Sequence, residues 1–495
     1  MPNHRAINAR DLADRVPMVV VDNGRPVPTR RVCKPIVARR ACEVGIIGGG
    51  PGGLMTAYAL QDLADGPMRV TLFEASARVG GKIMTPHFAT KPVRYEAGAA
   101  EFYDYSHLGT DPLKELIAEL GLSISPMGGS AVISKNRVLA NLDDIRDALG
   151  PHAAQALIAF DRRAKDAMTP REFFNAGDLD EPRAGSSPNG FEALLANVAS
   201  PEAQHYIGHL IHSDLAAEPC QTSVEYGLQN YLMNDPGYLR LYCIDGGNER
   251  LPQALAARLS ASTLLEHRVE SVERLPDARL RVKSQHRGQP VQHDFDVVVV
   301  ALPHNHVMSV TYGGDRLARA VREHHHHYDH PAHYLRVTAL FEHRFWRETI
   351  ADSYWMLDAC GGCCLYDESS RDPSSPFGVL SWLFGGTAAR DMSALTDEQL
   401  IARALEALPH FLAPGRTSFL EGRVDRWVGA VNAMPGGAVP RSLDRRHQPE
   451  PVEHANLFMV GDYMYDSTLN GVLDSAEHVA AWIAATVADA SARNP

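Results

Sequence analysis

The 495-residue sequence is poor in cysteine and lacks a long apolar run. Its 7 Cys are odd in number and irregularly spaced, which indicates reduced thiols rather than a disulfide framework. The longest uncharged stretch, residues 44–60, holds six Gly and one Pro, so it does not predict a membrane-spanning helix. Lys plus Arg is 48 and Asp plus Glu is 60, giving a net charge of −12. That balance disfavours nucleic-acid partners, because phosphate recognition needs a basic face.

The N-terminus also lacks the apolar segment of a signal peptide, so we expect a cytoplasmic protein. Residues 1–40 are expected to form an extension outside the folded domains. What the sequence does have is an ordinary globular composition, with 45% apolar and 22% charged residues. At about 150 residues per domain, its length predicts two to three domains.

A glycine-rich turn stands between a predicted strand and a predicted helix. The β-rich run at 44–47 is followed by Gly48, Gly50 and Gly53 in the spacing G-x-G-x-x-G, and a helical pattern comes next. Gly48 permits the tight turn, Gly50 lets the backbone approach a pyrophosphate, and Gly53 allows close packing of helix and strand. Free N–H groups at the helix N-terminus favour the anion. The motif predicts a dinucleotide site.

A second predicted strand, residues 69–74, ends in an acid at the expected distance. Glu74 lies 21 residues after Gly53, where a carboxylate accepts hydrogen bonds from a ribose diol. The segment that follows adds glycines and cations that can continue a diphosphate cradle: Arg78, Gly80, Gly81 and Lys82.

With these motifs the sequence resembles the FAD-binding amine oxidase superfamily. That superfamily includes monoamine, polyamine and L-amino-acid oxidases, protoporphyrinogen oxidase and phytoene desaturases. The resemblance implies FAD as the cofactor and continues in two further blocks. In the second block, a glycine turn and helix at 244–259 precede a valine-rich buried strand at 296–303. By this resemblance Val269 contacts the adenine through its backbone.

The third block, residues 457–476, resembles the closing motif of the superfamily. It implies that Gly461 and Asp462 lie at the cofactor, with Asp462 binding the ribityl or pyrophosphate part of FAD. It also implies that the helix starting near Gly471 points its N-terminus at the flavin. A helix dipole stabilises the negative charge of a reduced flavin ring.

The blocks predict an α/β fold, with a Rossmann-like FAD-binding domain built from discontinuous segments and an interleaved α+β substrate domain. Helical periodicity and strand-like alternation between the blocks support this division. We expect substrate at the interface of the two domains. The FAD-binding domain is assigned to residues 41–110, 241–312 and 421–490, and the substrate domain to residues 111–240 and 313–420.

Glu101 is a candidate for substrate recognition. It follows the segment 95–100, which resembles the superfamily's Glu-x-Gly-Ala motif beside the flavin. L-Amino-acid oxidases carry an Arg near this position to hold the substrate carboxylate. A carboxylate suits a cationic amine instead, and the alternative is a local cap or salt bridge.

Two aromatic residues are further candidates. Trp427 resembles the Trp that precedes the substrate-facing loop in amine oxidases, and Tyr463 lies in the closing block. Large rings can sandwich a substrate against the flavin or stabilise a cation. The alternative for both is plain core packing.

Arg336 is the fourth candidate, at a position where relatives usually have a Lys that holds a water against flavin N5. A guanidinium stays charged and suits a carboxylate or carbonyl oxygen. Two alternatives stay open. Arg336 clamps an acidic group of the substrate, or it pairs with Glu101 and leaves a neutral pocket.

No metal site is predicted. The segment 360–364 has the cysteine spacing of a zinc knuckle, but its two central glycines favour a hairpin turn. Residues 324–327 are four consecutive His, for which we expect a solvated surface loop.

The sequence therefore predicts an FAD-dependent oxidoreductase that oxidises a C–N bond of an amine or amino acid to an imine, with O₂ as electron acceptor. The expected partners are a small-molecule substrate and O₂, and a homodimer is compatible with the sequence. Two alternatives stay open: an FAD-dependent desaturase or isomerase acting on an apolar substrate, and a non-catalytic flavoprotein used for partner binding.

Overall fold

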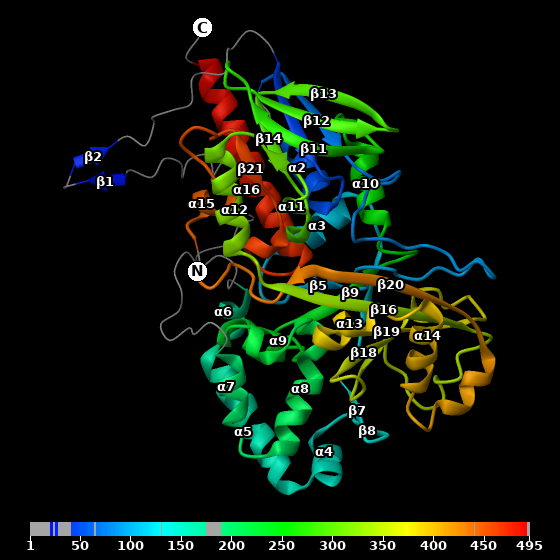
Figure 1. Ribbon diagram of the computed structural model, residues 1–495. Helices are drawn as coiled ribbons and strands as arrows, with labels where there is room; N and C mark the ends of the chain where they lie inside the picture. The colour runs from blue at the N-terminus through cyan, green and yellow to red at the C-terminus, as the bar shows by residue number, and fades with distance from the viewer. Residues whose placement is uncertain are drawn as a thin grey trace.

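The computed structural model describes residues 20–22, 25–27, 41–63, 66–129, 131–174, 190–439 and 441–492. It has two lobes, one above the other in Figure 1. Within the expected extension, the described residues form β1 (Val20–Asp22) and β2 (Arg25–Val27), which pair with each other. The remainder of residues 1–40 lies outside the described part of the chain.

The upper lobe is built on a five-stranded sheet in which every neighbouring pair is parallel. It unites segments that are far apart in the sequence, as the three blocks predicted, so the α/β class with a parallel sheet is confirmed. In spatial order its strands are β10 (Ser262–Leu264), β4 (Met68–Phe73), β3 (Cys42–Ile47), β14 (Val297–Val300) and β21 (Leu457–Met459).

Four consecutive valines make up β14 because both faces of this sheet are covered. Val297 and Val299 pack among α2 (Pro51–Leu63), α10 (Arg250–Arg258) and α16 (Leu469–Ala492). Val298 and Val300 point the other way, into a cluster that includes α12 (Asp315–His327). Side chains alternate between the faces of a strand, so a strand buried on both faces has no polar positions.

Two smaller sheets complete this lobe and its junction with the lower one. The sheet over the second face runs β13 (Gln289–Phe295), β12 (Leu280–His286), β11 (His267–Arg274) and β15 (Thr311–Tyr312). The other consists of β5 (Phe102–Asp104), β9 (Arg240–Ile244) and β6 (Ile124–Met127). β5 and β9 lie between the lobes in Figure 1.

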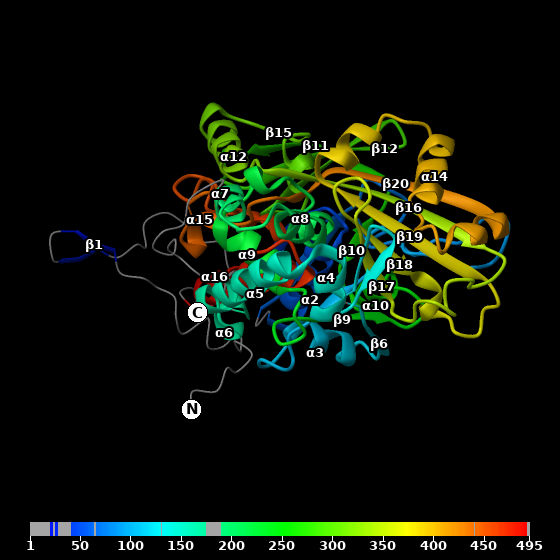
Figure 2. The ribbon, with the colours of Figure 1, turned by 90° about the horizontal axis from the view of Figure 1, so that it is seen from below.

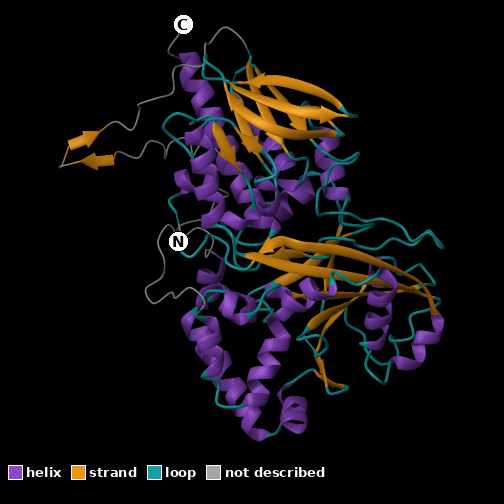
Figure 3. Cartoon of the chain, in the orientation of Figure 1, coloured by secondary structure: helices purple, strands orange, loops and turns teal. Residues whose placement is uncertain are grey.

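A seven-stranded sheet forms the centre of the lower lobe (Figure 3). β20 crosses the expected domain boundary at residue 421 and belongs to this sheet along its length. The domain boundaries assigned from the sequence stay a prediction. In spatial order the strands are β20 (Phe419–Asn432), β16 (Pro331–Phe341), β19 (Gly378–Gly385), β18 (Cys363–Asp367), β17 (Tyr354–Leu357), β7 (Val132–Ser134) and β8 (Arg137–Leu139).

Helices lie on both sides of the lower sheet. Figure 2, the view from below, shows one helical group beside the strands and α14 on the far side of them. The helical periodicity expected before residue 240 is confirmed by α4 (Leu142–Leu149), α5 (Pro151–Ala167), α6 (Pro170–Phe174), α7 (Phe191–Ala196), α8 (Pro201–Leu215) and α9 (Val224–Leu232). The other side carries α13 (Gly386–Met392) and α14 (Asp397–Glu406), and α3 (Pro112–Glu119), α11 (His304–Val307) and α15 (Leu443–His447) belong to the upper lobe.

The hairpin expected at residues 360–364 is confirmed. β17 and β18 pair in antiparallel register, with Leu357 opposite Cys363. Cys360, Gly361 and Gly362 form the turn with φ angles of 54°, 85° and 122°. Gly361 and Gly362 adopt their positive values without steric cost.

The surface loop expected for the four consecutive His is wrong, because they form the last turn of α12. Leu317, Val321 and His324 follow the helical spacing i, i+4, i+7 and make its buried face. His324 is 1% exposed, and its Nε2 hydrogen-bonds the Arg446 carbonyl at 2.7 Å. Burial lowers the pKa of His324 to about 3, so the ring is neutral.

No helix in the described ranges combines the length and the apolarity that crossing a membrane requires.

Candidate functional site: a cavity between the lobes

A cavity of about 570 Å³ opens at the carboxyl ends of the central parallel strands. Ile47 and Phe73, the last residues of β3 and β4, line it together with Ala301 after β14. Strands β16 and β20 of the lower sheet close its opposite side. In open parallel sheets the carboxyl ends of the strands are the usual place for a bound ligand.

Most of the predicted cofactor residues line this cavity. Gly48, which has φ +112°, passes so close to the neighbouring strand that a Cβ would lie 2.5 Å from the Ala301 carbonyl oxygen. A side chain is thus excluded at the turn, as the motif predicted. The lining set comprises Gly48, Gly50, Glu74, Gly81, Lys82, Val269, Gly461 and Asp462.

Two bare backbone segments face each other at the glycine turn. A Cβ added to Gly81 would lie 3.1 Å from Gly50 Cα, and one added to Gly50 would meet only Gly81 Cα, at 3.8 Å. Glu74 borders the same space, with its Oε2 accepting the Gly49 N–H at 2.9 Å. Open backbone, a helix N-terminus and a held carboxylate fit the diphosphate and ribose of a dinucleotide.

Gly53, Arg78 and Gly80 support this wall from behind and do not line the cavity. A Cβ on Gly53 would lie 2.0 Å from the Gly48 oxygen, so its role is the close helix–strand packing that the motif predicted. The Arg78 guanidinium donates hydrogen bonds to backbone carbonyls, including one from Nη2 to Gly81 O at 2.6 Å. The Gly80 N–H donates to the Gly49 carbonyl at 2.8 Å.

The closing block contributes the start of α16. Thr468 and Leu469 line the cavity at the N-terminus of this helix. Gly471 lies one step behind, donating its N–H to Thr468 Oγ1 at 3.1 Å. On the other side of the cavity, Lys82 Nζ lies 3.6 Å from Asp462 Oδ2 and donates to a backbone carbonyl of β20 at 2.6 Å. The Lys82–Asp462 contact joins the first block to the third at the edge of the cavity.

Trp427 and Tyr334 stand side by side on the lower wall. They are register partners on β20 and β16, and both line the cavity. The Trp427 indole N–H donates to the Ala97 carbonyl at 2.7 Å, which holds the ring in place. Sequence reasoning missed Tyr334, although its place two residues before Arg336 puts both on one face of a strand.

Tyr463 lies outside the cavity, so we assign it a packing role in place of the predicted catalytic one. It is 1% exposed. Its ring packs against Tyr328, with centroids 5.4 Å apart, and against His304 at 5.1 Å.

Arg336 is fully buried in the wall and has an acidic partner that neither predicted alternative named. Its Nη1 lies 2.7 Å from Glu368 Oε1 and donates to Ser381 Oγ at 3.1 Å. Its guanidinium carbon lies 5.0 Å from the centre of the Tyr366 ring, a cation–π contact. The pairing with Glu101 considered from the sequence is not formed.

A second ion pair balances this group. Arg371 lies 3.5 Å from Glu368 and 3.5 Å from Glu96, and all of these side chains are almost fully buried. Two guanidinium groups and two carboxylates therefore compensate one another. We call Arg336, Arg371, Glu368 and Glu96 the balanced group. No element of the sequence pattern indicated Glu368 or Arg371, since both follow β18 in the chain and meet β16 only through the sheet.

Glu101 lines the cavity and lies outside this balanced group. Its Oε1 accepts the Tyr366 hydroxyl at 3.0 Å, while its Oε2 is buried without a hydrogen-bond partner. Burial raises the pKa of Glu101, and the nearby Arg336 charge opposes that shift. Among the described residues, no cationic side chain forms an ion pair with it. Glu101 is thus a carboxyl group in the cavity wall that forms no ion pair.

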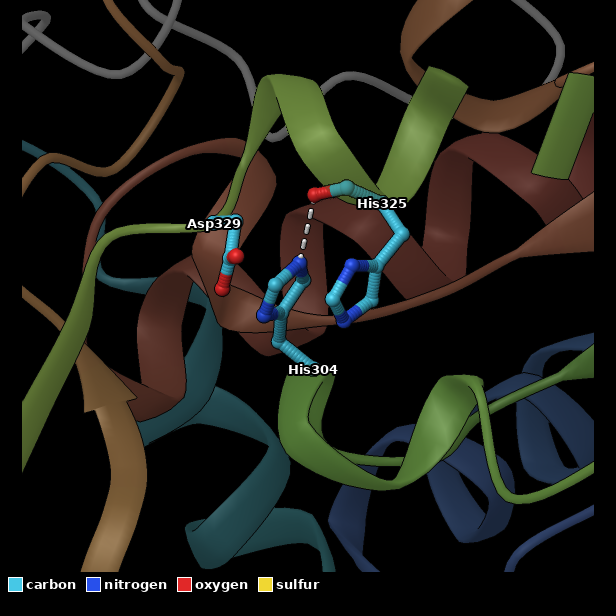
Figure 4. A group of neighbouring side chains, drawn as sticks. All are labelled: His304, His325 and Asp329. Atoms are coloured by element: carbon cyan, nitrogen blue, oxygen red, sulfur yellow. Dashed lines mark hydrogen bonds between the residues drawn. The ribbon is translucent and has the colours of Figure 1, made fainter. Parts of the chain in front are cut away.

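Between the start of α11 and the end of α12, the described residues include one group of possible metal ligands: His304, His325 and Asp329 (Figure 4). Their ligand atoms lie within 4.8 Å of one another. The two imidazole rings are stacked, with centroids 4.0 Å apart and an angle of 15°, and His304 Nε2 is hydrogen-bonded to the His325 carbonyl. Ring lone pairs lie in the ring plane, so nearly parallel rings do not converge on one ion. We assign no metal there.

The fold and cavity define a dinucleotide-binding flavoprotein, and comparison with known proteins identifies the family. The family model described as "Flavin containing amine oxidoreductase" matches residues 51–484. The chain therefore belongs to the flavin-containing amine oxidoreductases, a family of flavin-dependent oxidoreductase enzymes, and FAD is its cofactor.

Several solved structures share the fold. An engineered variant of putrescine oxidase superposes with a TM-score of 0.66 at 20% identity, covering 90% of this chain and 98% of that one. Cyclohexylamine oxidase from Brevibacterium oxydans IH-35A gives 0.65 at 19% identity, covering 90% and 99%. A putative protoporphyrinogen oxidase from Exiguobacterium sp. 255-15 gives 0.63 at 18%, also covering 90% and 99%.

Among curated proteins, the similarity is confined to short segments. Coproporphyrinogen III oxidase of Mycobacterium tuberculosis is 37% identical over 78 residues, 16% of this chain and 16% of that protein. Achacin of Lissachatina fulica is 33% identical over 85 residues, 17% of this chain and 15% of that protein.

Proposed function

We propose that this protein oxidises the C–N bond of a cationic amine that carries no carboxylate next to its nitrogen. The single observation that carries the proposal is the charge at the lower end of the cavity. Glu101 forms no ion pair, whereas Arg336 is paired with Glu368 at 2.7 Å. A carboxylate without a partner attracts an ammonium group and repels an acid.

We further infer that the five-stranded parallel sheet is a Rossmann-like FAD-binding unit. The glycine turn after β3, the held Glu74 and the start of α16 would hold the cofactor along the upper wall. FAD, when bound, supplies the two-electron acceptor for a hydride from the carbon beside the nitrogen. We name O₂ as the terminal electron acceptor, with peroxide as co-product.

Glu101 would act in binding and in proton transfer. Oε2 accepts a hydrogen bond from the substrate ammonium, and the raised pKa of Glu101 makes the carboxylate a better proton acceptor than an exposed one. The proton passes from nitrogen to Oε2, which leaves a neutral amine whose lone pair can assist loss of hydride. Trp427 and Tyr334 line the space around the carbon chain and exclude water from it.

The balanced Arg336 argues against an α-amino acid held by its carboxylate. A guanidinium already bound to Glu368 has its charge compensated, and drawing it away would leave a buried carboxylate unpaired. Hexylamine is therefore expected to be a better substrate than the amino acid of the same chain length, 2-aminoheptanoate.

Anaerobic mixing of the FAD-loaded protein with primary amines tests the proposal. Hexylamine or benzylamine should bleach the visible flavin absorption, and admitting air should restore it with release of peroxide. If no member of an amine panel bleaches a flavin that dithionite reduces normally, the amine proposal fails. Reduction by an apolar alkene or a porphyrinogen in its place would favour the desaturase alternative.

A further inference from the structure

A buried histidine near the end of α8 bridges three segments of the lower lobe. His212 is 6% exposed and lies one turn before the helix ends at Leu215. Its Nδ1 lies 3.0 Å from the Gly362 carbonyl oxygen, in the hairpin turn between β17 and β18. Its Nε2 lies 3.2 Å from Glu218 Oε1, in the segment that follows the helix. The ring therefore joins α8 to the hairpin turn and to the chain beyond the helix.

Both nitrogens of this ring face oxygen atoms that only accept hydrogen bonds. A backbone carbonyl has no proton to give, and an ionised carboxylate has none either. A neutral imidazole carries one N–H, so it can satisfy only one of the two oxygens, whereas an imidazolium carries two and satisfies both. The geometry around His212 therefore fits the charged form of the ring.

The contacts of Glu218 keep its carboxylate ionised. The hydrogen bond with His212 lowers the pKa of Glu218 to about 2, although burial acts to raise it. Its Oε1 also accepts the Thr387 N–H at 2.9 Å, at the start of α13. Burial acts to lower the pKa of His212, but the hydrogen bonds to Glu218 and Gly362 outweigh it, so that pKa is raised. Glu218 is therefore ionised throughout the pH range in which His212 titrates.

Glycines leave the space that the His212 ring occupies. A Cβ on Gly386, the first residue of α13, would lie 2.8 Å from His212 Nε2 and 2.7 Å from Glu218 Oε1. One on Gly361, in the hairpin turn, would lie 3.3 Å from His212 Cε1. On α8 itself the titratable neighbour is His209, one turn earlier, and burial lowers its pKa. The hairpin and α13 thus present glycine backbone to the ring, and Glu218 presents the charge.

The end of α8 supports one wall of the main cavity. The Asp214 carbonyl accepts the Tyr334 hydroxyl at 3.1 Å, and the Ala216 carbonyl accepts the His333 N–H at 2.8 Å. Both donors belong to β16, and the Tyr334 ring lines the cavity. The His212 carbonyl in turn accepts the Ala216 N–H at 3.1 Å. A movement of the helix end would therefore reach the cavity wall through two hydrogen bonds.

We propose that His212 and Glu218 form a proton-dependent clasp, which fixes the end of α8 and with it the Tyr334 wall of the cavity. The clasp is closed with the imidazolium, because both oxygens then receive a proton. Loss of the proton leaves one oxygen without a donor, and a buried acceptor without a donor is costly. The folded state thus holds this proton more tightly than the unfolded state. The stability that the clasp contributes is complete below about pH 6.5 and is lost as pH rises through the raised pKa of His212.

Amide hydrogen exchange of the FAD-loaded protein at pH 6 and pH 9, followed by mass spectrometry, tests the clasp without any substrate. After correction for the intrinsic pH dependence of exchange, the peptide containing Thr387 should exchange about tenfold faster at pH 9, because its N–H donates to Glu218. The peptide containing His333 should follow by a smaller factor. His212→Gln should exchange fast at both pH values. His205→Gln, at an exposed position two turns earlier on α8, is the matched control and should keep the wild-type response.

A second variant guards against misfolding of the first. Glu218→Gln keeps an oxygen for the Thr387 N–H and removes the charge that holds the His212 proton, so the difference between pH 6 and pH 9 should disappear. Equal exchange of the wild type at the two pH values, or a pH response that survives His212→Gln, would overturn the clasp. A response at Thr387 without one at His333 would overturn its link to the cavity wall. Failure of the proposed amine oxidation would leave these measurements unaffected.

Discussion

The upper and lower ends of the cavity are built from different parts of the polypeptide. Glycine backbones, a helix N-terminus and a held Glu74 form the upper end. Ionisable and aromatic side chains form the lower end, where Glu101 and Arg336 come from separate elements. The upper end is suited to a ligand whose chemistry is shared by many proteins. The lower end is suited to distinguishing one ligand from another, because its charged groups and aromatic rings would contact the parts of a ligand that vary.

Substitutions at the glycine turn should have the largest effect, since they act on the upper end alone. Gly50→Val places a side chain in the open gap before Gly81, where the nearest protein atom to an added Cβ is Gly81 Cα, at 3.8 Å. We therefore expect a folded, largely colourless protein that has lost its flavin. The flavin-to-protein absorbance ratio measures this, and a fully yellow variant would contradict the assignment.

Gly53→Ala provides the contrast within the same turn. Its Cβ would lie 2.0 Å from the Gly48 oxygen, so the fold itself must shift to accept it. A lowered melting temperature of the flavin-free protein is expected here and not for Gly50→Val.

Breaking the balanced group at the lower end should cost the most stability. Glu368→Gln leaves Arg336 and Arg371 buried with one carboxylate between them, which is expected to lower the free energy of unfolding by about 3–5 kcal/mol. Urea unfolding would measure it. Glu266→Gln breaks an ion pair to Arg287 of the same 2.7 Å length on the surface, and should lower the free energy of unfolding far less. Similar losses for the two variants would show that the buried group is not specially coupled.

At the same end of the cavity, a substitution of Glu101 should affect substrate turnover without affecting the balanced group. Glu101→Gln should lower kcat/KM for a primary amine by at least about thirtyfold, through a higher KM and a lower kcat, because one charge-assisted hydrogen bond and the proton acceptor are lost. Flavin content should be unchanged. In the wild type, kcat/KM should rise as pH increases through the raised pKa of Glu101, and the variant should lack this rise. Unchanged kinetics would mean that Glu101 serves only to accept the hydrogen bond of the Tyr366 hydroxyl.

The smallest effect concerns the pH dependence of stability that the Asp214 side chain, at the end of α8, contributes. The pKa of Asp214 is raised from 3.8 to about 8, with Glu101 and Asn234 facing it. The folded state therefore holds this proton more tightly than the unfolded state, and the stability contribution of Asp214 falls as pH rises from 4 to 8. Asp214→Asn should remove that part of the slope, giving a higher melting temperature than the wild type at pH 8 and a similar one at pH 4. A parallel slope in both proteins would contradict the raised pKa.

Features that depend mainly on local backbone conformation could be predicted from the sequence. The glycine spacing, the valine run of β14 and the hairpin at residues 360–364 follow from steric freedom and from two-residue alternation, and all are present in the structure. The helical His run was predicted wrongly because composition was weighed over spacing, although Leu317, Val321 and His324 lie one above another on a helix.

The upper end of the cavity can be recognised from glycine positions alone, since its turn must carry bare backbone. The lower end depends on contacts between distant parts of the chain, which the glycine and hydrophobic patterns do not reveal. Arg336 meets Glu368 because β16, β19 and β18 are hydrogen-bonded neighbours. The charge that a buried side chain presents depends on which distant residue compensates it, and packing alone brings those residues together.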